Sequence, residues 1–97
     1  MLNHIVMFRR KAETAADPVL ENALVARMDG LGTQVPDIRS WRLSANELDR
    51  PICWGYVLES GFDDADGLNA YLFHPLHQAL IADLKTYFEW AAVDYTV

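Results

Sequence analysis

The order of two kinds of hydrophobic spacing along the chain most constrains what it can fold into. Segments with the composition of β-strands occur at residues 2–8, 38–45, 53–60 and 89–97. Apolar residues spaced three or four apart, as on one face of a helix, follow the first and the third of these segments. This β-α-β-β-α-β order predicts a ferredoxin-like α+β fold, in which two helices cover one face of a four-stranded sheet.

The second helical region is interrupted within the stretch AYLFHPLHQAL, residues 70–80. A residue that precedes proline is driven out of helical geometry, so the helix that carries Tyr71 should end near His74. Proline suits the first position of a helix, so Pro75 should open the next one. We therefore assign His74 and Pro75 to a structural turn. The expected buried stripe of the new helix is Leu76, Leu80, Leu84 and Phe88.

The distribution of apolar residues predicts a homodimer. The chain has 97 residues, of which 52% are hydrophobic, and we interpret residues 1–97 as one domain. Large apolar side chains occupy both faces of the first strand, where Ile5 and Met7 alternate with Val6 and Phe8. Because the helices cover only one face of the sheet, a second copy is the simplest cover for the other. The two sheets would then form a barrel around a two-fold axis.

Net charge, apolar runs and cysteine content indicate which partners and which cellular location to expect. A net charge of −6 argues against nucleic acid and anionic membranes, since both bind basic surfaces. No apolar run approaches the roughly 18 residues that span a bilayer. The single cysteine, Cys53, has no internal disulfide partner, so we expect a reducing, cytoplasmic location.

Three polar residues are candidates for one small-molecule site. His4 lies on the first strand, Tyr71 on a helix and His77 in the first turn of the next helix. Each residue taken alone is more often a structural or core residue, but helices in this fold lie over the strands, so the three can converge on an apolar cavity. There His77 would act as a general base and the Tyr71 hydroxyl would hydrogen-bond a developing enolate, while His4 would hold the substrate or fix the tautomer of a partner.

Other types of site are poorly represented. His74 and His77 are three residues apart across a helix break, and zinc would require at least one more ligand, so we expect no metal site. The sequence contains no glycine-rich phosphate-binding loop, and no cofactor is expected. The tryptophans at positions 41, 54 and 90 are expected in the core or at the dimer interface.

Several segments resemble the stress-responsive dimeric α/β-barrel family. They are HIVMFRRK, VPDIRSWRLSAN, WGYVLESGFDDADGLNAYLFHPLHQAL and AVDYTV. The resemblance implies the same ferredoxin-like dimer. One family member, a plant polyketide cyclase that forms olivetolic acid, performs an aldol condensation without metal or cofactor. By that similarity Tyr71 and His77 are catalytic, and His4 lines the cavity.

The sequence also departs from that cyclase. Met28 falls near the position of a further cavity tyrosine, and Ser44 stands where many relatives have glycine. We therefore expect His4, Met28, Tyr71 and His77 to contact a substrate that differs from the cyclase's own.

Three hypotheses for the function follow. The first is a homodimer with an apolar cavity for a small, apolar or aromatic, polyketide-like molecule that bears oxygen. Such a protein would be a cofactor-free cyclase, isomerase or lyase that uses His77 and Tyr71. The second is a non-catalytic stress-associated protein or ligand carrier, whose histidines are structural. The third, by analogy with other dimeric barrels, is a monooxygenase or a haem-binding protein.

Overall fold

The computed structural model describes all 97 residues and contains four strands and three helices. In chain order they are β1 (Leu2–Arg10), α1 (Pro18–Leu31), β2 (Ser40–Ala45), β3 (Tyr56–Phe62), α2 (Ala65–Leu72), α3 (Pro75–Leu84) and β4 (Phe88–Thr96). The predicted order is confirmed, and the second helical region is divided at Pro75 as expected. No helix combines the length and the apolar composition needed to cross a membrane.

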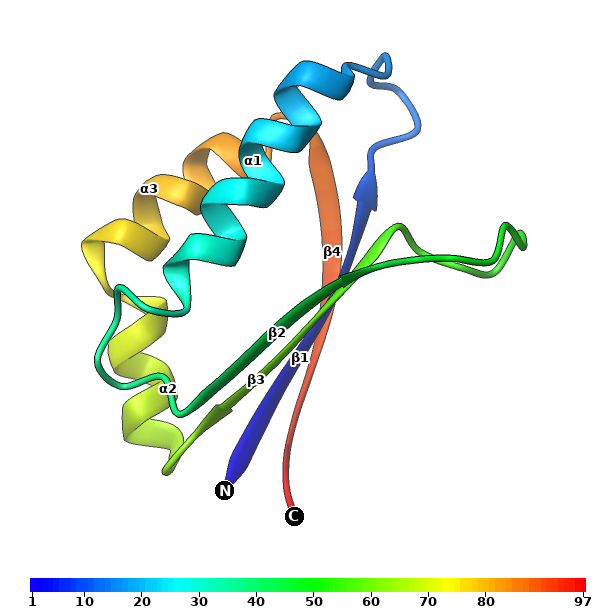
Figure 1. The fold of residues 1–97 in the computed structure, drawn as a ribbon. Helices are drawn as coiled ribbons and strands as arrows, with labels where there is room; N and C mark the ends of the chain where they lie inside the picture. Colours follow the sequence, from blue (N-terminus) through cyan, green and yellow to red (C-terminus); the bar gives the residue numbers. More distant parts are fainter.

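The strands form one antiparallel sheet in the order β2-β3-β1-β4. All three helices lie on one side of this sheet (Figure 1). Directly paired residues of neighbouring strands point to the same face. His4 of β1 pairs with Ser60 of β3 and with Asp94 of β4, so the three side chains share the face that the helices cover.

The hydrophobic core lies between the sheet and the helices. Its largest fully buried side chains are Phe8, Phe62, Tyr87 and Phe88. Phe8 stacks on Tyr56 and meets Phe88 edge-on, with ring centroids 4.9 and 5.2 Å apart. This aromatic cluster fills the space above the sheet near the C-terminal end of β1.

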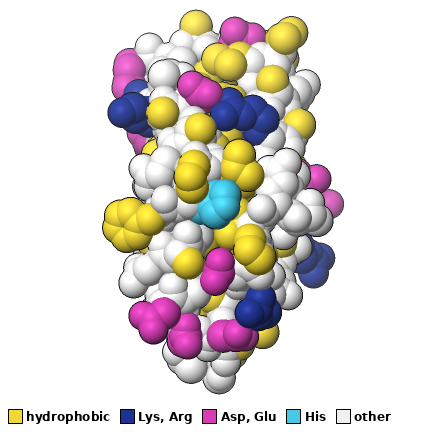
Figure 2. Space-filling view, turned by 90° about the vertical axis from the view of Figure 1, so that its left-hand side faces the viewer, with side chains coloured by type: hydrophobic (Ala, Val, Ile, Leu, Met, Phe, Trp, Pro, Cys, Tyr) yellow, Lys and Arg dark blue, Asp and Glu magenta, His cyan; other side chains and the backbone are white.

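The opposite face of the sheet is uncovered within the single chain, as predicted. Met7 and Val93 point to this open face and are 42% and 63% exposed. Ile5 lies directly opposite Val93 across the β1–β4 ladder. On the helical side, Figure 2 shows apolar side chains around a histidine near the centre, with acidic side chains both above and below it.

Several predicted boundaries were wrong. The second and third strands begin at Ser40 and Tyr56 rather than at residues 38 and 53. The third strand starts late because residues 50–53 form a turn, in which the Cys53 N–H donates to the Arg50 carbonyl at 3.0 Å; Trp54 follows this turn, with the Arg9 guanidinium 4.0 Å from its ring centroid. Residues 46–55 instead form an irregular arm that extends away from the helices (Figure 1).

Two positions in the predicted helical stripes were also wrong. Leu76 is 45% exposed because it lies in the first turn of α3, before the helix reaches the core. Phe88 is buried, but it is the first residue of β4 and not part of the helix. The helical spacing extended past the end of α3 at Leu84, where a short turn leads into the strand.

Glycine at position 32 permits a close contact that supports the cavity. A Cβ atom there would lie 2.4 Å from the Trp41 ring, which in turn meets the ring of Tyr71 edge-on at 5.7 Å. Gly30, two residues earlier in α1, has no atom within 4 Å of the equivalent position. Of these two glycines, only Gly32 is required by packing.

We predict opposite effects from alanine at these two glycines. Gly32→Ala should lower the free energy of unfolding by about 1–3 kcal/mol, because the added methyl group displaces Trp41. Gly30→Ala should raise it by about 0.5–1 kcal/mol, since alanine favours the helix. Urea unfolding monitored by circular dichroism measures both changes, and equal effects of the two substitutions would contradict the packing model.

Candidate active site

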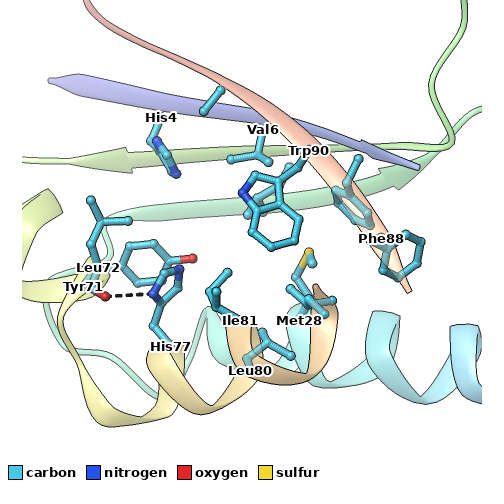
Figure 3. Close-up of a pocket in the computed structure, with 14 residues that line it drawn as sticks. His4, Val6, Met28, Tyr71, Leu72, His77, Leu80, Ile81, Phe88 and Trp90 are labelled. Atoms are coloured by element: carbon cyan, nitrogen blue, oxygen red, sulfur yellow. Dashed lines mark hydrogen bonds between the residues drawn. The ribbon is translucent and has the colours of Figure 1, made fainter. Parts of the chain in front are cut away.

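A cavity of about 260 Å³ lies between the sheet and the three helices, where core packing is incomplete. Fourteen residues line it, and twelve of them are hydrophobic. They are His4, Val6, Phe8, Met28, Leu58, Tyr71, Leu72, His77, Leu80, Ile81, Leu84, Phe88, Trp90 and Ala92 (Figure 3). No aspartate, glutamate, lysine or arginine is among them, so the cavity suits an uncharged, largely apolar molecule.

The break between α2 and α3 shapes the polar end of this cavity. Pro75 has no N–H group, and the chain leaves helical geometry at His74, which has φ −64° and ψ 137°. The Leu76 N–H donates to His74 Nδ1 at 3.1 Å, so the His74 side chain caps α3. In a continuous helix this N–H would donate to the Leu72 carbonyl. The break therefore leaves the Leu72 oxygen free for other donors.

His77 uses the carbonyl that the break frees. Its Nδ1 lies 2.8 Å from the Leu72 oxygen. A carbonyl only accepts hydrogen bonds, so Nδ1 carries the ring proton and Nε2 of the neutral ring is an acceptor. Burial lowers the pKa of His77, and the proximity of His4 lowers it further, although the bond to Leu72 opposes the shift. His77 is therefore a neutral imidazole near neutral pH.

Tyr71 lies beside His77 at the same end. Its side chain is 3% exposed and its ring centroid is 4.4 Å from that of His77. Figure 3 shows the Tyr71 hydroxyl next to the His77 ring, on the cavity side. Burial raises the pKa of Tyr71, and no hydrogen bond contributes to this shift. The phenol stays protonated and is available to donate to a ligand.

His4 completes the polar end from the sheet. It is 7% exposed, and its ring centroid lies 6.3 Å from that of Tyr71. Its Nδ1 is hydrogen-bonded to the Asp94 carboxylate, which is the residue paired with it on β4. The Ser60 hydroxyl donates to the His4 backbone carbonyl at 2.9 Å. The carboxylate orients the His4 ring, with Nδ1 as the donor toward Asp94.

The structure thus brings together His4, Met28, Tyr71 and His77 around one cavity. Met28 lies in its apolar part, with its side chain 6% exposed. His74 is not a lining residue and instead caps α3, beside Pro75. No group of three or more histidine, cysteine, aspartate and glutamate residues lies close enough to hold a metal ion.

Sequence reasoning missed two residues of the site. Asp94 holds His4, and its only signal was its position on the strand face opposite to that of Val93 and Tyr95. Trp90 lines the cavity from that same face of β4, although the core or the dimer interface was expected. The positions of Asp94 and Trp90 in the site depend on the register between β1 and β4, which the spacing of residues within one strand does not reveal.

Comparisons with known proteins agree with this fold. An uncharacterised protein of Streptomyces coelicolor is 37% identical over 95 residues, which cover 98% of each chain. A dimeric ferredoxin-like protein of unknown function from Bacteroides fragilis is 27% identical, with a TM-score of 0.83 over 99% of this chain and 95% of the other. A hydroxynitrile lyase from Passiflora edulis shares the fold at 16% identity, with a TM-score of 0.82 over 99% and 92%.

The family itself follows from a match along almost the whole chain. The model of the stress responsive A/B barrel domain matches residues 2–97, which include every strand, every helix and the whole cavity lining. The chain belongs to the stress responsive A/B barrel domain family.

Proposed function

We propose that this protein binds a small, uncharged, largely apolar carbonyl compound and removes a proton from the carbon next to its carbonyl group. One observation carries the proposal: the free Nε2 acceptor of His77 and the unpartnered Tyr71 hydroxyl lie together at the end of an apolar cavity. This acid–base pair fits a cofactor-independent cyclase, isomerase or lyase whose reaction begins with removal of such a proton.

The chemical step uses only these two side chains. The His77 Nε2 lone pair takes the proton, and the electrons of the broken C–H bond form a carbon–carbon double bond. The carbonyl π electrons move to oxygen, and the Tyr71 hydroxyl donates a hydrogen bond to the resulting enolate. The imidazolium then returns its proton to the carbon, or the enolate attacks a second carbonyl carbon of the same molecule, whose π electrons move to its oxygen; that oxygen then takes the proton from the imidazolium. His4, held by Asp94, orients the substrate.

The burial of His77 and Tyr71 supports their proposed roles as base and hydrogen-bond donor. A neutral imidazole is the base that the step needs, and the lowered pKa of His77 keeps it neutral. The raised pKa of Tyr71 keeps its proton available for donation. The lining is largely apolar, and a hydrogen bond to the enolate is stronger in such surroundings than in water.

We also propose that the active form is a homodimer joined through the open faces of two sheets. The open face presents exposed Met7 and Val93, and a single chain has nothing to cover them. The relative from Bacteroides fragilis is described as dimeric, as is a 26% identical ferredoxin-like protein from Jannaschia. The helices and the cavity lie on the outer side of each sheet in this arrangement.

Hydrogen–deuterium exchange tests proton removal without knowledge of the natural substrate. Nonan-2-one in D₂O should exchange its α-protons at least about tenfold faster with the protein than with an equal concentration of imidazole, because His77 and Tyr71 act together. His77→Gln should return the rate to that of imidazole, and Tyr71→Phe should lower it about tenfold. Proton NMR measures the rates.

His74→Asn is the matched control for that assay. Asparagine is a good helix N-cap, so this variant removes a histidine from the same turn without loss of the cap. It should keep the wild-type exchange rate. Equal rates for His77→Gln and the wild type would contradict catalysis, and retained ketone binding in that case would favour a carrier.

The lowered pKa of His77 predicts a specific loss of stability in acid. Below the ordinary histidine pKa of about 6.5, the unfolded chain binds a proton at His77 that the folded chain does not. The free energy of unfolding should therefore fall as the pH drops below about 6.5, and this contribution should be complete above that pH. Urea unfolding at about pH 7.5 and 5.5 should show a smaller loss for His77→Gln than for the wild type; equal losses would contradict the assignment.

A charge on the open face tests the dimer. Val93→Asp should weaken dimerisation by about a hundredfold or more, because two-fold symmetry buries two unpaired carboxylates. Val19→Asp is the control, since Val19 lies on α1 and is 82% exposed on the other side of the molecule. Light scattering after size-exclusion chromatography should show a monomer for Val93→Asp only. A wild-type monomer would refute the proposed interface.

A further inference from the structure

Trp90 lies in the cavity and is not needed for the proposed proton transfer. It extends from β4 on the face that also carries Ala92 and Asp94, and it pairs with Phe8 of β1. Its side chain lines the cavity, yet the residue is 37% exposed, so it lies where the cavity meets solvent. Figure 3 shows the indole across the middle of the cavity, with its nitrogen toward the His4 end and its six-membered ring toward Met28.

The indole N–H of Trp90 is a hydrogen-bond donor without a partner in the protein. An indole nitrogen donates one hydrogen bond and accepts none. None of the hydrogen bonds within the protein involves the Trp90 N–H, and the residue lines the cavity while remaining 37% exposed, so this group is available to a ligand in the cavity. Around it the lining is hydrocarbon. A lone donor in such surroundings discriminates between ligands with and without an acceptor at that point.

We propose that Trp90 determines specificity, and that its N–H group binds a second oxygen of the ligand whose carbonyl lies at Tyr71 and His77. This inference rests on the proposed function and narrows its substrate class. The ligand is an uncharged compound with two separate oxygen acceptors and an apolar tail that reaches Met28 and Phe88. A carboxylate is disfavoured because no cationic side chain lines the cavity.

The strand register separates the two oxygens. His4 pairs with Asp94 and Phe8 pairs with Trp90, so the two pairs lie four residues apart. Four residues of a β-strand span about 13 Å. The side chains lean into the same cavity, which shortens this separation, and we assign one oxygen of the ligand to each of the two positions. The two oxygens therefore belong to different carbons of the ligand, as in a dione or a hydroxyketone.

Three ketones test this inference: nonan-2-one, nonane-2,4-dione and nonane-2,6-dione. At least one dione should bind about threefold to tenfold tighter than nonan-2-one, which is the range that one net hydrogen bond provides. Trp90→Phe should remove this preference, because phenylalanine keeps an aromatic ring but has no donor. Trp54→Phe is the matched control, since Trp54 stacks on Arg9 outside the cavity. It should bind all three ketones as the wild type does.

A spectroscopic measurement on the wild-type protein is independent of any folding defect in the variants. The three indole N–H signals in a nitrogen–proton correlation spectrum are assigned with single tryptophan-to-phenylalanine variants. The preferred dione should move the Trp90 indole proton downfield, whereas nonan-2-one should not.

The possible failures are distinguishable. A dione that binds without moving the Trp90 signal, or a preference that survives in Trp90→Phe, would overturn the role of Trp90 and leave the proposed function intact. Failure of all three ketones to bind would overturn this inference together with the proposed function.

Discussion

The missing N–H group of Pro75 determines most of the chemistry available to this protein. Proline at this position ends α2 and starts α3. The Leu76 N–H, which would donate to the Leu72 carbonyl in a continuous helix, donates to His74 Nδ1 instead. That oxygen then receives the Nδ1–H of His77 and, at 2.6 Å, the side-chain amide of Gln78. The helix break at Pro75 thus selects the Nδ1-protonated tautomer of His77. The result is an acceptor nitrogen that faces an apolar cavity.

The surrounding packing makes this geometry rigid. Tyr71 is the last buried residue of α2 before the break, and its ring contacts Phe62 and Trp41 as well as both cavity histidines. Trp41 in turn requires the absence of a side chain at Gly32. Aromatic contacts therefore hold the phenol from behind, while its hydroxyl has no internal partner. A donor fixed in this way loses little entropy when a ligand oxygen arrives.

Local sequence patterns predicted the parts of this arrangement that depend on one element at a time. The helix break at Pro75 was predictable because proline acts on its immediate neighbours, and alternation along β1 placed His4 with Val6 and Phe8. The partnership of His4 with Asp94 joins residues 90 positions apart, and only the register of β4 against β1 creates it. Trp90 eluded prediction for the same reason. The proline at position 75 marked a break, but not which donor would take the freed carbonyl.

The cavity and the open sheet face both reduce the apolar packing that stabilises this short chain. Only 16 of the 97 residues are buried in the single chain, and the cavity removes packing contacts from the centre of that small core. A chain of this size has little other apolar surface with which to offset the loss. Burial of the open face in the proposed dimer adds apolar contacts on the side of the sheet away from the cavity. Dimerisation then stabilises the sheet that carries His4, Asp94 and Trp90 without filling the space in which they meet a ligand.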